Sequence, residues 1–177
     1  MKYLKMSLMV IGGLLAVLVV VGLLLPNTAH VERKISIQAN PEKIFPYLNG
    51  YKTFNLWSPW AGIDPNTFYI YEGPTTGIGA KMSWSSKHPD VGKGSQIITK
   101  TETNKRVEIN LDFMEQGQAT TYYELKPQGQ QTEVVWGFDT HFGWDLFARY
   151  FGLMIEQFIG PQYEKGLSKL KTLVEKK

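Results

Sequence analysis

A run of eighteen residues without one polar side chain, Leu8 to Leu25 (LMVIGGLLAVLVVVGLLL), constrains this chain more than any other feature. As a helix the run covers about 27 Å, close to the hydrocarbon thickness of a bilayer. A core helix of a soluble protein would show polar residues with a 3.6-residue period, and this run shows none. The sequence therefore predicts a membrane-spanning helix that ends at Pro26 and Asn27.

A cleaved secretory signal is the alternative interpretation of the same run. The apolar region of a signal peptide is normally shorter, and the residues Asn27-Thr28-Ala29 make a poor cleavage site. The preferred interpretation is therefore an uncleaved anchor and linker, residues 1–30, followed by one domain, residues 31–177.

The basic residues that flank the apolar run bear on its orientation. Lys2 and Lys5 lie on one side, and Arg33 and Lys34 follow closely on the other. The positive-inside rule is nearly balanced between them. We expect a single-pass protein whose domain is extracytoplasmic.

Composition excludes several classes of function. Residues 31–177 carry 17 basic and 16 acidic residues, without the basic stripe typical of a nucleic-acid binder, so no nucleic-acid partner is predicted. The absence of cysteine excludes disulfide scaffolds, thiol nucleophiles and zinc–thiolate sites. The three histidines form no metal-binding motif, and the glycine pairs precede strands rather than helices. Neither a metal nor a cofactor is predicted.

Alternating apolar residues and turn signals predict many strands after the linker. Val107, Ile109, Leu111 and Phe113 face one way while their neighbours are polar, which is typical of a sheet with one solvated face. A short helix is expected from Pro41 to about Gly50. The predicted strands are 31–38, 67–72, 79–86, 93–102, 105–114, 118–126 and 131–141.

The apolar period changes to that of a helix over residues 144–175. Gly160-Pro161 predicts a kink or a short break within it. The fold class expected is α+β, with a curved antiparallel sheet around a long C-terminal helix and one transmembrane helix in front.

The element order and five local motifs resemble the START-like, or SRPBCC, superfamily, and within it the polyketide cyclase/dehydrase-like branch. The resemblance covers residues 31–177. Its motifs are Leu56-Trp57-Ser58-Pro59-Trp60-Ala61, Gly77-Ile78-Gly79-Ala80 running into Trp84, Gly92-Lys93-Gly94-Ser95, Thr132-Glu133-Val134-Val135-Trp136, and Tyr163 to Lys171.

The resemblance implies a helix-grip fold with a deep cavity between the sheet and the long helix. Relatives bind lipids, sterols, polyketides or other hydrophobic molecules, and some catalyse cyclisation or dehydration. A hydrophobic small molecule or lipid is accordingly the predicted partner, beside the membrane itself through residues 8–25. The side chains predicted to bind it are Trp57, Trp60, Tyr69, Trp84, Ile109, Leu111, Tyr123, Trp136, Phe138, Phe147, Phe151 and Met154.

Three alternatives to this assignment stay open. In the first, the aromatic side chains simply fill the core, which is the favoured interpretation for any one of them. A cyclase or dehydratase would need a proton-handling group in the cavity, for which Tyr123 or Tyr69 is the candidate, and no convincing catalytic constellation supports it. A protein-interaction module would use the outer face of the sheet. Asp139 and His141 lie on that outer face and are interpreted as a solvated strand end.

Overall fold

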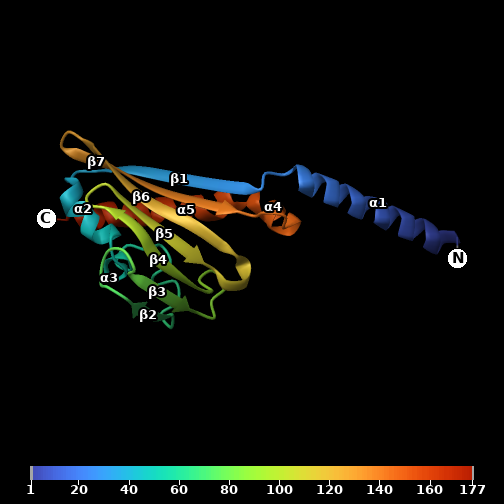
Figure 1. Ribbon diagram of the computed structural model, residues 1–177, viewed down its shortest axis with the longest axis horizontal. Helices are drawn as coiled ribbons and strands as arrows, with labels where there is room; N and C mark the ends of the chain where they lie inside the picture. The colour runs from blue at the N-terminus through green and yellow to red at the C-terminus, as the bar shows by residue number, and fades with distance from the viewer. Residues whose placement is uncertain (1, 177) are drawn as a thin grey trace.

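The computed structural model describes residues 2–176, and the predicted α+β architecture is confirmed. One long apolar helix projects from a domain built of one sheet and several helices (Figure 1). The elements in chain order are α1 (Lys2–Leu24), β1 (Thr28–Ile37), α2 (Pro41–Leu48), α3 (Tyr51–Phe54), β2 (Phe68–Glu72), β3 (Lys81–Ser85), β4 (Lys93–Glu102), β5 (Arg106–Asp112), a 3-10 turn (Met114–Gln116), β6 (Gln118–Gln128), β7 (Gln131–His141), α4 (Leu146–Gly152) and α5 (Ile155–Glu175).

The seven strands form one antiparallel sheet in the order β1-β7-β6-β5-β4-β3-β2. Strand β1 closes onto the last strand of the meander, so the first and last strands in the chain are neighbours. Helix α5 packs against β1 and β7 on one side of the sheet, which we call the inner face. The short helices α2 and α3 and the loop after them cover another part of that face.

Strand register decides which side chains face inward. Val31, Phe138, Thr121 and Ile109 lie opposite one another across four strands, and all four are buried. Because successive side chains alternate between faces, the intervening positions point to the outer face. The predicted alternation in 105–114 is confirmed in β5, where Val107 and Ile109 are buried.

Of the kink or short break predicted at Gly160-Pro161, the break does not occur, because α5 continues through both residues and the helices separate at Leu153 and Met154 instead. A contact from β1 spans this point of the helix. The Arg33 guanidinium bonds to Glu156 and Glu164, one turn before and one turn after Gly160. It lies so close to Gly160 that an added Cβ would stand 2.3 Å from Nη2. This bridge holds the helix across the proline, which removes one backbone hydrogen bond.

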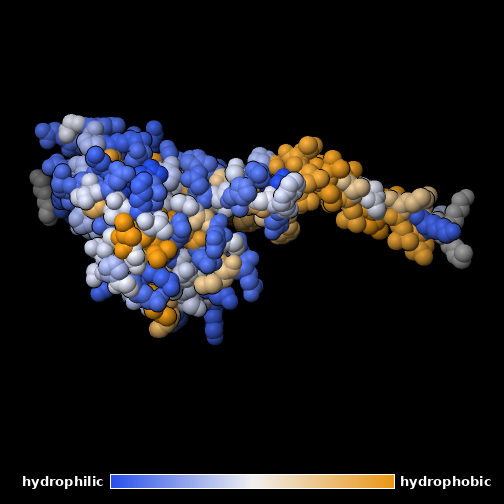
Figure 2. Space-filling model, in the orientation of Figure 1, coloured by the Kyte–Doolittle hydropathy of each residue, from blue (hydrophilic) through white to orange (hydrophobic). Residues whose placement is uncertain are grey.

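Helix α1 touches the domain only near its C-terminal end. Its side chains are otherwise exposed, and the described residues contain one helix long and apolar enough to cross a membrane, Tyr3–Leu24. Figure 2 shows it as a hydrophobic rod beside a domain whose visible face is mostly hydrophilic. The assignment of α1 as a possible membrane span rests on its length and composition, which a signal sequence shares.

Helix α4 provides the contact with α1. The Arg149 guanidinium, itself buried, donates to the carbonyl oxygens of Leu23 at 3.1 Å and Leu25 at 3.3 Å. Leu23 is in the last turn of α1 and Leu25 directly follows it, where the carbonyls lack intrahelical partners. The Tyr150 hydroxyl donates to the carbonyl oxygen of Leu18 at 2.6 Å. The two helices lie side by side at this junction (Figure 1).

Candidate functional site

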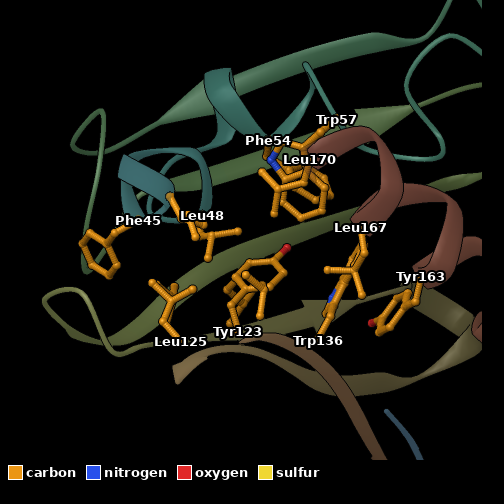
Figure 3. Close-up of a cluster of buried hydrophobic side chains, with 14 of the residues drawn as sticks. Phe45, Leu48, Phe54, Trp57, Tyr123, Leu125, Trp136, Tyr163, Leu167 and Leu170 are labelled. Atoms are coloured by element: carbon orange, nitrogen blue, oxygen red, sulfur yellow. The ribbon is translucent and has the colours of Figure 1, made fainter. Parts of the chain in front are cut away.

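The space between the sheet and α5 holds a cluster of aromatic side chains (Figure 3). Trp57 meets Trp136 and Tyr123 at ring-centroid distances of 5.1 and 5.6 Å. Tyr163 of α5 stacks on Trp136 at 3.8 Å. These are contact distances for aromatic rings, so in this part of the interior the rings pack on one another. Helix α5 approaches closely through Gly166, where an added Cβ would stand 2.7 Å from the Trp136 ring.

The Thr121 hydroxyl links this cluster into a polar network. It donates to the carbonyl oxygen of Gly137 at 2.7 Å, and it lies 2.9 Å from Nε1 of Trp136 and 3.1 Å from the Tyr163 hydroxyl. A threonine hydroxyl has one proton and two lone pairs, so once it donates to Gly137 it must accept from both aromatic partners. The Tyr163 hydroxyl therefore donates its hydrogen bond to Thr121. The network satisfies three buried polar groups.

The tyrosine hydroxyls of the interior stay protonated at neutral pH. Burial raises the pKa of Tyr123 well above its usual value, and burial likewise raises that of Tyr163. Burial also raises the pKa of Tyr69, which is half-buried. A general base must lose its proton near the working pH, and these groups are shifted in the opposite direction.

The twelve residues singled out from the sequence divide into three groups by exposure. The closely packed core contains Trp57, Ile109, Tyr123, Trp136 and Phe138. A second group is partly accessible and packs against that core: Trp60, Tyr69, Trp84 and Leu111. The third group, Phe147, Phe151 and Met154, is exposed around α4 rather than facing the interior.

Three of the partly accessible side chains form a continuous strip with a residue that the prediction omitted. Tyr69 pairs with Trp84 across β2 and β3, and the Trp84 ring lies 6.2 Å from Phe113. Leu111 precedes Phe113 by two residues. We call these four residues the inner rim. Leu111 lies level with Ala29 near the start of β1, and Phe113, Trp84 and Tyr69 occupy positions beyond the row of Thr28. The inner rim therefore lies at the end of the sheet from which α1 projects.

An exposed apolar patch surrounds α4 and the start of α5. Trp144 and Phe147 are each 84% exposed and Phe151 is 51% exposed. The Phe151 and Phe158 rings stack at 5.9 Å. Of this patch, Trp144, Leu153 and Phe158 are absent from the predicted binding residues. All three lie within residues 144–175, for which the helical period was predicted.

A hollow of 820 Å³ lies on the outer face of the sheet, not between the sheet and α5. The strand register shows this, because its polar side chains other than Thr140 occupy outward positions. His30 and Asp139 lie across it, with Nδ1 and Oδ1 2.7 Å apart. Asp139 thus pairs with His30 and not with His141. The predicted outward direction of Asp139 and His141 is confirmed. The hollow is lined by Thr28, Ala29, His30, Ser95, Ile97, Asn110, Leu111, Asp112, Gln118, Ala119, Thr120, Asp139, Thr140 and His141.

Residues 28–175, from the first residue of β1 to the last of α5, match the sequence family described as polyketide cyclase/dehydrase and lipid transport. The chain belongs to this family. The resemblance drawn from the five motifs is thereby confirmed. A search among curated proteins gives no match.

Solved structures share the fold of this polyketide cyclase/dehydrase and lipid-transport family member. The Aha1 dimer from Colwellia psychrerythraea is 20% identical, with a TM-score of 0.56 over 83% of this chain and 96% of that one. A protein from Chromobacterium violaceum is 16% identical, with a TM-score of 0.59 over 86% and 100%. A Staphylococcus aureus protein of unknown function is 12% identical, with a TM-score of 0.60 over 84% and 95%. At these identities the likeness shows the fold alone.

Proposed function

We propose that this family member is a membrane-anchored START-like domain that binds a hydrophobic small molecule or lipid. The observation that carries the proposal is the inner rim, a strip of partly accessible apolar side chains at the end of the sheet from which α1 projects. A sparingly soluble ligand partitions into a bilayer, so a domain tethered by α1 would hold this strip near its ligand's reservoir. In this proposal α1 is the uncleaved anchor and residues 31–177 form the binding domain.

The binding region we propose centres on Trp60, Tyr69, Trp84 and Leu111, with the packed aromatic cluster behind them. The closely packed members, Trp57, Ile109, Tyr123, Trp136 and Phe138, would form its inner wall, and Phe147, Phe151 and Met154 its approach from the membrane. Pockets for small apolar ligands are lined mainly by such side chains, with a few polar groups to fix orientation.

Neighbouring positions on β5 provide a matched test of binding. Leu111 faces inward and is half-buried, whereas Asn110 faces the outer surface and is exposed. We expect the full chain, extracted from its own host in mild detergent, to show a stoichiometric hydrophobic adduct in native mass spectrometry. Leu111→Arg should lose that adduct, because a charge would enter the apolar strip. Asn110→Arg should retain it.

Two results would contradict the binding proposal. One is a wild-type chain that carries no adduct, and the other is equal adduct occupancy in Leu111→Arg and Asn110→Arg. Lipids bound to α1 alone would remain in both variants. This distinguishes them from a ligand bound at the inner rim, which only Leu111→Arg should remove. Near-ultraviolet circular dichroism of the two variants confirms that each is folded.

We also propose that the domain lies on the extracytoplasmic side, with Lys2 and Lys5 retained in the cytoplasm. The cysteine-free sequence makes the test direct. A single cysteine at Ser168, exposed on α5, should react with a membrane-impermeant maleimide on intact cells. Labelling that occurs only after the cells are lysed would place the domain inside.

A further inference from the structure

The depth at which α4 meets α1 has a consequence for how the domain sits on a membrane. The apolar run that ends at Leu25 covers about 27 Å, which is just enough to cross the hydrocarbon layer. Leu18 lies seven residues before Leu25, or about 10 Å deeper along the helix axis. The Tyr150 hydroxyl of α4 reaches the Leu18 carbonyl oxygen. Gly22 allows the close approach, since an added Cβ would stand 3.1 Å from the Tyr150 ring.

The chemistry of α4 suits that depth. Its one charged side chain, Arg149, is buried and occupied by backbone carbonyls of α1 and of Gly143. The Asp145 side chain caps the helix by accepting from the backbone N–H of Ala148 at 3.0 Å. The two exposed side chains of α4 are Phe147 and Phe151, both aromatic. Helices that lie in a membrane interface bury an apolar face about 5–10 Å into the boundary between headgroups and acyl chains.

We propose that α4, with Trp144 before it and the start of α5 after it, is an interfacial helix whose exposed aromatic side chains are immersed in the lipid bilayer. This inference rests on the proposed anchoring of the chain by α1. Continuity with α1 selects the bilayer as the occupant of the patch, because hydrogen bonds fix α4 beside the part of α1 that lies below the membrane surface. Tryptophan is enriched at that level, and phenylalanine is typical of the apolar face of interfacial helices.

Collision accessibility of spin labels tests the depth in the full chain. Single cysteines are placed at Phe147 in α4, at Val17 in α1 and at Ser168 in α5, and each labelled chain is reconstituted in phosphatidylcholine/phosphatidylglycerol vesicles. Oxygen dissolves in the lipid, and a nickel chelate stays in the water. Relative to the Ser168 label, the labels at Phe147 and Val17 should both be less accessible to nickel and more accessible to oxygen. The label at Ser168 should behave in the opposite way.

Each other outcome overturns the inference in a distinguishable manner. If the Phe147 label is as accessible to nickel as the Ser168 label while Val17 lies in lipid, α4 is not immersed and the anchor still stands. If Val17 is also exposed to nickel, the anchor fails together with the inference. If the Phe147 label is shielded from both reagents, protein such as a second copy of the chain covers the patch. The native adduct is measured separately, so loss of ligand binding leaves this result unaffected.

Discussion

Trp136→Ala should lower the free energy of unfolding by about 4 kcal/mol, the cost of removing a large aromatic side chain from a packed core. Trp136 is 2% exposed and contacts Trp57, Tyr123 and Tyr163. Its removal leaves space that these rigid rings cannot easily fill. Guanidinium unfolding of the full chain in nonionic micelles, followed by near-ultraviolet circular dichroism, measures the change.

Trp144→Ala is the matched control for this substitution. The Trp144 side chain is exposed, so its truncation should change stability by less than about 0.5 kcal/mol. A loss below about 1 kcal/mol for Trp136→Ala would contradict close packing. It would mean that Trp136 borders an open space, which would move the binding region from the inner rim into the centre of the domain.

Thr121→Val should cost about 3 kcal/mol, although the two side chains have nearly the same shape. Valine cannot accept the hydrogen bonds that Thr121 receives from Trp136 Nε1 and from the Tyr163 hydroxyl. Both donors are buried, and an unsatisfied buried donor carries its full desolvation penalty. The same unfolding experiment measures the effect.

Thr120→Val provides the comparison for Thr121→Val, since the neighbouring side chain points to the outer face of β6. We expect its stability change to stay within about 0.5 kcal/mol. A cost for Thr121→Val as small as that expected for Thr120→Val would show that water reaches Trp136 and Tyr163. A hydrated interior would in turn restore Tyr163 as a group able to exchange a proton with a bound molecule.

Much of the sheet could be predicted from the sequence because its turns and its alternation are local signals. The predicted strands 93–102 and 131–141 coincide with β4 and β7, and the remaining strand ends differ by a few residues. The inward and outward directions of the strand side chains followed from their alternation along each strand. Glycine, proline and asparagine between the strands marked the turns.

The continuity of α5 could not be predicted, since it depends on a residue far away in the chain. Gly160-Pro161 is a reliable local signal for interruption, and only the position of Arg33 on β1 reveals the bridge that spans it. The true separation at Leu153 and Met154 has a similar origin. Helix α4 packs on α1 while α5 packs on β1, so one apolar stripe in the sequence serves two different partners.

The same limitation applies to the candidate site. The alternation along the strands correctly predicted that Tyr123 and Trp136 face inward. It could not distinguish rings that pack on one another from rings that line a cavity. Helical spacing likewise gave Phe147 and Phe151 an apolar face without showing what that face contacts. Both questions depend on distances between elements, which periodicity does not contain.

With α1 as the anchor, the short connection between α1 and the sheet would make the domain sensitive to the thickness of the bilayer. Only three residues separate Leu24 from Thr28, and the backbone N–H of Phe142 fixes Asn27 by donating to its carbonyl oxygen at 2.7 Å. Arg149 donates to the carbonyl oxygens of Leu23 and Leu25, so hydrogen bonds to the domain hold the connection on both sides of Pro26. A spanning helix tilts when the bilayer is thinner than its apolar run, and a rigidly attached sheet turns with it. With α1 as the anchor, bilayer thickness would set the height of the inner rim above the lipid.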